Sequence, residues 1–124
     1  MIDIERIAPD AHQFLVYGEI SRDDIAAFIA FAKAQVESGE RSHALFDMTS
    51  IASLPTLSAI TLELANMGTL MKWVYQLDRI AVVSDEAWLR AASRIESALL
   101  PGVSYAVYDA DEADKARAFV LGKG

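Results

Sequence analysis

The sequence predicts an α/β fold with one mixed β-sheet, on two observations. Apolar runs typical of strands alternate along the chain with segments in which apolar residues recur every three or four positions, as in amphipathic helices. The expected order is strand, strand, helix, strand, helix, strand, helix, strand, helix. This alternation favours parallel pairing, with an antiparallel first strand because its link to the second is short. The 124 residues, of which 53% are hydrophobic, predict a single domain over residues 1–124.

The first third of the chain carries clear signals for where its elements begin and end. Residues 2–7 mix charged and apolar side chains and predict an edge strand, whereas residues 13–20 are rich in aromatic and branched side chains and predict a second strand. Residues 9–12 supply the turn between them. Ser21 is suited to cap the following helix, and Gly39 is suited to end it in the left-handed conformation.

The later strands are apolar on both faces. One precedes Asp47, and the clearest strand of the chain is expected at residues 77–84. If the helices lie mostly on one face of the sheet, the second apolar face needs a cover, which is either a helix that crosses over or a second subunit. Three further helices are expected at residues 57–73, 85–99 and 113–120, and a last strand is expected at residues 103–108. The spacing of Asp109 and Glu112 resembles a capping box before the last helix.

The most unusual stretch of the sequence is nearly free of charge. Between Met48 and Met71, Glu63 is the only ionisable residue, in a chain that is 23% charged. The helix predicted there is apolar on too much of its circumference to face water freely. Large apolar patches on soluble proteins usually mark binding sites. We therefore expect this helix to bind a protein partner, or another copy of the chain, through one stripe of side chains: Leu57, Ile60, Leu64, Met67 and Met71.

Two other functions remain open at this stage. The same helix, residues 73–75 and the carboxyl ends of the strands could enclose a pocket for a small apolar or lipid-like ligand, because methionines such as Met67 suit an adaptable pocket. An enzyme is not expected. The nearest approach to a hydrolase motif, residues 102–106 around Ser104, lacks the second glycine and leads into a strand instead of a helix.

Few side chains in this sequence suggest catalysis or metal binding. Asp47 and Asp85 each follow a predicted strand, at the sheet edge where α/β proteins bind ligands. The simpler interpretation of Asp47 is that it accepts hydrogen bonds from the next turn. His12 and His43 are isolated, and we expect them on the surface. Without a metal-binding or phosphate-binding motif, we expect no cofactor and no metal.

The overall composition argues against a nucleic-acid partner, secretion and a membrane span. A net charge of −7 and a pI near 4.7 argue against nucleic acid, which attracts basic surfaces. The sequence has no cysteine, which fits a reducing compartment. No signal peptide is visible in the first residues. The longest uncharged run, residues 48–62, is shorter than a membrane span. We therefore expect a cytoplasmic protein without a transmembrane segment.

Several motifs together resemble the SpoIIAA-like group of bacterial proteins, which is related to STAS and Sec14-type domains. The matching segments are residues 18–24, 44–47, 79–88 and 111–119, so the resemblance covers nearly the whole chain. It implies a small SpoIIAA/STAS-like α/β fold that agrees with the predicted order of elements. STAS domains act as regulatory interaction modules and Sec14-type domains hold apolar ligands, so the resemblance implies one of these two functions.

The resemblance also points to candidate phospho-acceptors. STAS anti-sigma antagonists present a phosphorylatable Ser or Thr near the start of the second helix, after an Asp and before a Gly. Here Ser53 and Thr56 match by location, while the Asp and Gly are absent. A phosphate there would meet unpaired amides and the positive end of the helix dipole. The alternative is that these hydroxyls only cap and line the turn.

Overall fold

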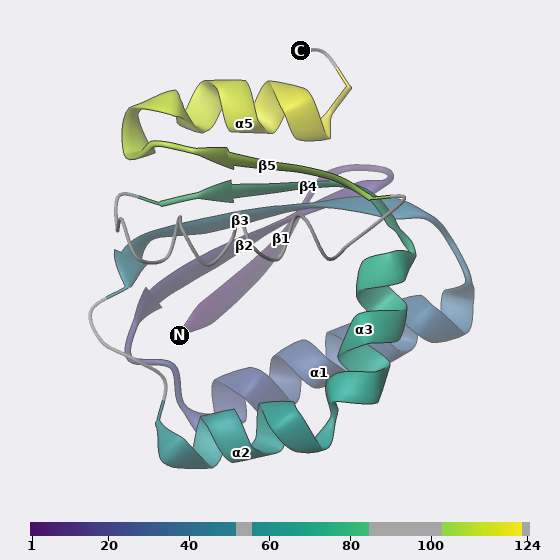
Figure 1. The fold of residues 1–124 in the computed structure, drawn as a ribbon, viewed down its shortest axis with the longest axis vertical. Coiled ribbons are helices and arrows are strands. Elements are labelled where there is room, and N and C mark those ends of the chain that lie inside the picture. Colours follow the sequence, from purple (N-terminus) through teal and green to yellow (C-terminus); the bar gives the residue numbers. More distant parts are fainter. Residues whose placement is uncertain (52–55, 85–102, 123–124) are drawn as a thin grey trace.

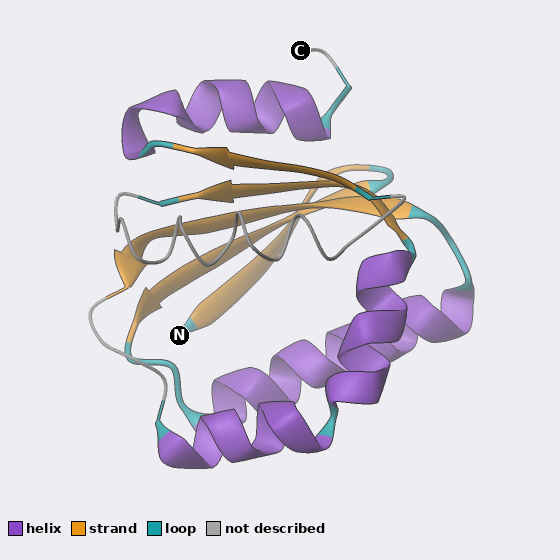
Figure 2. Ribbon diagram, viewed as in Figure 1, coloured by secondary structure: helices purple, strands orange, loops and turns teal. Residues whose placement is uncertain are grey.

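The computed structural model describes residues 1–51, 56–84 and 103–122. Its five strands form one mixed sheet in the order β1-β2-β3-β4-β5, so neighbours in the sheet are also successive strands of the chain (Figure 2). β1 pairs antiparallel to β2, and the other pairs are parallel, which confirms the predicted sheet. The strands are β1 (Ile2–Ala8), β2 (Ala11–Gly18), β3 (Ser42–Ile51), β4 (Leu77–Val83) and β5 (Ser104–Tyr108).

The helices lie on both sides of this sheet (Figure 1). α1, α2 and α3 form a layer on one side, and α5 lies on the other. The helix predicted at residues 85–99 lies outside the described residues. The described helices are α1 (Arg22–Ser38), α2 (Leu57–Ala65), α3 (Met67–Tyr75), the short 3-10 helix η1 (Ala110–Glu112) and α5 (Ala113–Val120).

Both predicted ends of α1 are confirmed. The Ser21 hydroxyl accepts a hydrogen bond from the Asp24 amide at 3.3 Å, and the Asp24 carboxylate accepts one from the Ser21 amide at 2.8 Å. This capping box pairs two backbone donors around the first turn of the helix. Gly39 ends the helix at φ 69°, a conformation in which a side chain would be strained. The Ser21 hydrogen bonds hold the pKa of Asp24 below its usual value.

An aromatic cluster fills the space between the sheet and the layer of α1 and α3. Phe14 of β2 is fully buried and stacks on Phe46 of β3, with ring centroids 4.8 Å apart. Trp73 of α3 and Phe28 of α1 meet Phe14 edge to face, each at 5.5 Å. Edge-to-face and offset-stacked pairs of this kind are favourable beyond the area that they bury. The sheet is therefore joined to two helices through one set of rings.

The opposite side of the sheet is packed with smaller side chains. Leu45, Ala81 and Val83 of β3 and β4 contact Ala116 and Val120 of α5, and all five are buried. The small side chains allow the helix to lie close to the strands. α5 thus covers the second apolar face of β3 and β4, so of the two covers that the sequence allowed, the helix that crosses over is the one observed.

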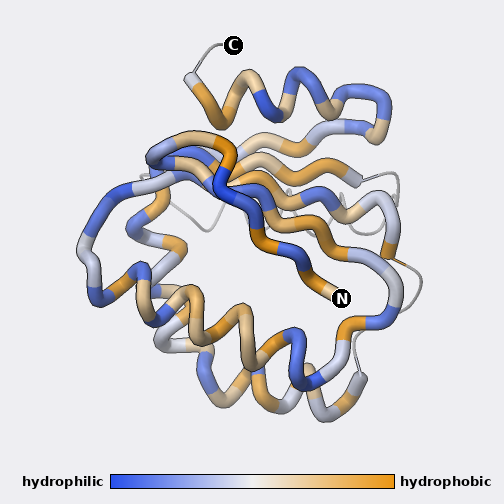
Figure 3. Tube along the Cα trace, turned by 180° about the vertical axis from the view of Figure 1, so that it is seen from behind, coloured by the Kyte–Doolittle hydropathy of each residue, from blue (hydrophilic) through white to orange (hydrophobic). Residues whose placement is uncertain are grey.

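β1 forms the edge of the sheet, as predicted. Asp3, Glu5 and Arg6 are exposed along it. Charged and apolar positions alternate along this strand in Figure 3, beside the N-terminus. Charges on an edge strand disfavour pairing with a strand of another molecule.

Three sequence predictions about element boundaries are wrong. β3 does not stop before Asp47 but continues to Ile51, because its last residues pair with Tyr17 and Gly18 at the end of β2. β2 begins at Ala11, two residues earlier than expected, and so includes His12. The helix expected over residues 57–73 is two helices that meet at Asn66.

Candidate functional site

The two most exposed large apolar side chains of the described helices lie on α2. Leu57 and Leu64 are 80% and 65% exposed, and Ile60 of the same helix is 37% exposed. Met67, the first residue of α3, follows at 39%. The opposite side of α2 is different, since Ala59 is fully buried against Val16 and Ile25. We call the four exposed side chains the α2 surface: Leu57, Ile60, Leu64 and Met67.

Local hydrogen bonds fix where α2 begins. Thr56 is the N-cap, and its hydroxyl accepts from the Ala59 amide at 3.1 Å. The Thr56 amide donates to the Ile20 carbonyl at 3.1 Å, which ties the start of α2 to the loop between β2 and α1. Thr56 is half-buried. The capping alternative for this hydroxyl is therefore observed, and its phosphorylation stays a prediction. Ser53 lies outside the described residues.

The break between α2 and α3 separates Met71 from the rest of the predicted stripe. The Asn66 side chain donates from Nδ2 to the Leu62 carbonyl at 2.9 Å, a local bond of the kind by which Asn competes with regular helix structure. α3 then turns toward the sheet instead of continuing the line of α2 (Figure 1). Met71 is half-buried there. The expectation of one straight stripe of five residues is therefore wrong, and the exposed part ends at Met67.

Asp47 makes the local contacts expected of a turn-capping carboxylate. Its Oδ1 accepts from the Thr49 amide at 3.1 Å and from the Thr49 hydroxyl at 2.8 Å. Asp47 is the last residue of β3 that pairs with β4, and an irregularity follows in the pairing with β2. The carboxylate therefore closes a bulge inside β3 instead of ending the strand. Asp85, its predicted companion, lies outside the described residues.

The two histidines are buried instead of exposed, contrary to the sequence-based expectation. His12 lies on β2 with its ring edge to face with Phe31, at a centroid distance of 5.0 Å. Burial, together with the nearby Arg6, lowers the pKa of His12. His43 lies near the start of β3, with Nε2 3.4 Å from an Asp10 carboxylate oxygen. Each histidine stands next to an apolar residue in the sequence, and the prediction of surface positions did not take this into account.

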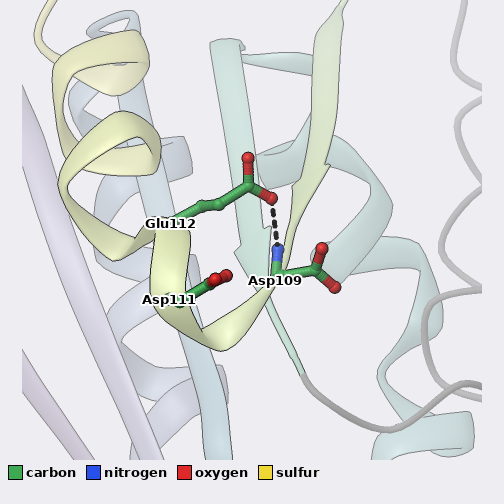
Figure 4. Close-up of side chains that lie close together, drawn as sticks. All are labelled: Asp109, Asp111 and Glu112. Carbon is green, nitrogen blue, oxygen red and sulfur yellow. Dashed lines mark hydrogen bonds between the residues drawn. The ribbon is translucent and has the colours of Figure 1, made fainter.

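A group of three carboxylates lies at the start of η1: Asp109, Asp111 and Glu112 (Figure 4). Glu112 Oε1 accepts from the Asp109 amide at 3.1 Å, and Lys115 Nζ lies 3.4 Å from Glu112 Oε2. The hydrogen bond from the Asp109 backbone is the main cause of a lowered pKa for Glu112. The bond from the Asp109 amide to Glu112 belongs to the capping box that the spacing of these two residues predicted. Capping accounts for the positions of Asp109 and Glu112, whereas Asp111 is exposed beside them.

The described helices offer no candidate membrane span, since none combines the necessary length and apolar character. The sequence predicted no catalytic residues. Among the described residues, the hydrogen bonds observed for the candidate carboxylate Asp47 come from Thr49, in the bulge that follows it. What remains distinctive is the α2 surface.

Comparisons with known proteins identify the fold and the family. The sequence matches the family described as SpoIIAA-like over residues 12–121. An uncharacterised protein with a SpoIIAA-like fold from Shewanella loihica PV-4 has a TM-score of 0.70 at 20% identity, over 97% of this chain and 92% of that one. A comparison with curated proteins finds no match.

Two structures of the anti-sigma factor antagonist SpoIIAA are also similar. The phosphorylated form, a Bacillus cell fate determinant, has a TM-score of 0.63 at 12% identity, over 96% of this chain and 99% of that one. The unphosphorylated form has a TM-score of 0.62 at 12% identity, over 96% and 98%. Likeness at these identities shows a shared fold. With the family match over most of its length, this chain belongs to the SpoIIAA-like family.

Proposed function

We propose that this chain is a non-enzymatic regulatory module that binds a protein partner through the α2 surface. The observation that carries the proposal is the exposure of Leu57 and Leu64, at 80% and 65%, on a helix whose only ionisable residue is Glu63. An isolated exposed leucine is ordinary, but several exposed apolar side chains at helical spacing on a helix with one ionisable residue are typical of a binding surface. The family and the fold support the proposal, since SpoIIAA is an anti-sigma factor antagonist.

The apolar-ligand carrier is the weaker candidate. The predicted pocket depends on residues 73–75 and the neighbouring strands, but Trp73 is only 3% exposed and its ring packs against Phe14 and Phe28. A ligand in this layer would have to displace rings that already contact one another. A partner that binds the α2 surface would displace no packed side chain, because these residues are already exposed.

Thr56 offers a way to regulate this surface. It precedes Leu57 directly and caps α2. A phosphate at Thr56 would add about −1.5 to −2 charges at neutral pH beside a surface that has none. This charge would oppose an apolar contact while it suits the positive end of the helix. We propose Thr56 and Ser53 as phospho-acceptors, and a cytoplasmic location, which the absence of cysteine supports.

Site-specific photo-crosslinking in the host cell tests the proposed function. A photoreactive amino acid at Leu57 or Leu64 should give discrete protein adducts. The same group at Ala113, an exposed position on α5 on the other side of the sheet, is the matched control and should give none. Equal labelling at all three positions, or no protein adduct at Leu57 and Leu64, would contradict the proposal. Thr56→Asp, which keeps a capping oxygen and adds a charge, should reduce the adduct yield.

A further inference from the structure

All the sulfur of this chain belongs to methionine. The sequence has four methionines and no cysteine, so any oxidation of sulfur in this protein takes place at a thioether. Oxidation turns the flexible, apolar side chain of methionine into a polar sulfoxide, and methionine sulfoxide reductases reverse the change. The four positions lie among the described residues: Met1, Met48, Met67 and Met71.

Met67 is the most exposed of the three internal methionines. It is 39% exposed, whereas Met48 and Met71 are half-buried. Met48 of β3 packs against two of the buried hydrophobic clusters, so a dissolved oxidant reaches it less easily. Met1 is exposed as well, at 53%, but it precedes β1 and is not part of the α2 surface. The exposed thioether on the proposed binding surface is therefore that of Met67.

The position of Met67 separates an effect on binding from an effect on the fold. In the free chain, the oxygen of a Met67 sulfoxide stays in water because the side chain is already exposed. A partner that covers the α2 surface would remove this oxygen from water, and burial of a polar group without a hydrogen bond is unfavourable. The side chains that share the surface with Met67, such as Leu64, are apolar and offer no donor for that oxygen. A sulfoxide at Met48 would instead place its oxygen against the core.

We propose that Met67 is a site of reversible oxidation that regulates the α2 surface, with hydrogen peroxide as the oxidant. One oxygen of the peroxide forms a bond with the Met67 sulfur while the O–O bond breaks, and the second oxygen leaves as water with both hydrogens. The sulfur is oxidised by two electrons, and the peroxide is reduced by two. The sulfoxide weakens partner binding and leaves the fold intact. This inference rests on the proposed function.

Tandem mass spectrometry of the purified chain during mild peroxide treatment tests the modification site, because it locates the added oxygen within a peptide. Met67 should gain one oxygen before Met48 and Met71 do. The thermal midpoint of unfolding, followed by circular dichroism, should stay unchanged while only Met1 and Met67 are oxidised. Oxidation of Met48 or Met71 at the same rate as Met67 would overturn the assignment, as would a lower midpoint at that stage.

Photo-crosslinking measures the effect of the sulfoxide on binding. The chain with a photoreactive amino acid at Leu57 is purified, oxidised until Met67 is converted, freed of peroxide and irradiated in a dialysed lysate of the host cell. The yield of the discrete adducts that form without peroxide should fall at least about fivefold, as expected for the burial of one unpaired polar group. Treatment of the oxidised chain with methionine sulfoxide reductases before irradiation should restore the yield.

The matched control is Met67→Leu, which keeps an apolar side chain of similar volume and removes the sulfur. In this variant the adduct yield should be the same with and without peroxide, even though Met1 is still oxidised. No loss of adducts on oxidation of Met67, or an equal loss in Met67→Leu, would overturn the regulatory role. A chain that gives no adduct at Leu57 even before oxidation would refute the proposed function, whereas the mass spectrometry would still decide whether Met67 is the site of oxidation.

Discussion

The two faces of the sheet are packed in different ways. On one face, the rings of Phe14, Phe46 and Trp73 bind the strands to two helices. On the other, among the described residues, short side chains such as Ala81 and Ala116 hold the eight-residue helix α5 close to β3 and β4. Within the described part of the chain, the aromatic face buries the larger side chains, so a substitution there should remove more packing contacts than one on the α5 face.

The largest predicted effect is at the centre of the aromatic face. Phe14→Ala should lower the free energy of unfolding by about 3–5 kcal/mol, because it removes a fully buried ring and leaves a cavity among its neighbours. Urea denaturation followed by circular dichroism measures the change. Phe14→Leu, which keeps most of the volume, should lose clearly less. A loss below that of Val120→Ala on the opposite face would reverse the comparison between the faces.

On the α5 face, Val120→Ala should lower the free energy of unfolding by about 2 kcal/mol, since two buried methyl groups and their packing are lost. The same denaturation measurement applies. Lys115→Ala, at an exposed position of α5, is the control and should have little effect. If Val120→Ala proves neutral, α5 contributes no packing energy to the fold.

A helix cap on the aromatic side should matter less than either core. Ser21→Ala removes the N-cap of α1 and should lower the free energy of unfolding by about 1 kcal/mol.

The capping partner Asp24 adds a pH dependence to this stability. Because its pKa is lower in the folded chain, its stabilisation is present above pH 4 and is lost as the pH falls through the folded value. Acid denaturation of Asp24→Asn should therefore show a shallower loss below about pH 4 than the unmodified chain. Identical acid denaturation profiles for Asp24→Asn and the unmodified chain would contradict a contribution of Asp24 to the pH dependence.

The smallest effect concerns His12 at the rim of the aromatic face. Its pKa is lowered by burial, so between the ordinary histidine value and the folded value the unfolded chain binds more protons. The free energy of unfolding should thus fall as the pH drops below about 6.5. His12→Phe, which retains a ring beside Phe31, should remove this part of the decline. Identical pH profiles for the two proteins between pH 7 and pH 5 would contradict the assignment.

Signals that act locally made the fold predictable. Ser21, Gly39 and the pair Asp109 and Glu112 each determine a helix end through contacts within a few residues, and all three expectations are confirmed. The strand order follows from short links and from the alternation of strands with helices. The apolar stripe that ends in Val120 predicted the last helix, but a stripe does not say which face of a sheet it will cover.

The errors occur where one side chain or a distant strand overrides the pattern. Asn66 interrupts a continuous apolar helix with a single bond to Leu62. The polar end of β3 stays extended because β2 pairs with it, and a local pattern does not contain that information. At the candidate site, the sequence predicted that Leu57 and Leu64 belong to a binding surface, and the structure shows that both side chains are exposed. Their role as a binding surface stays a prediction.

The identity of strand order and chain order has a consequence during synthesis. Each new strand can pair with the previous one as the polypeptide leaves the ribosome, so the sheet can grow without waiting for distant segments. Leu45 and Val83 of β3 and β4 gain their contacts with Ala116 and Val120 only after α5 has been made. Until then, the apolar atoms that α5 buries stay accessible, and transiently exposed apolar surface of this kind is where nascent chains aggregate or bind chaperones.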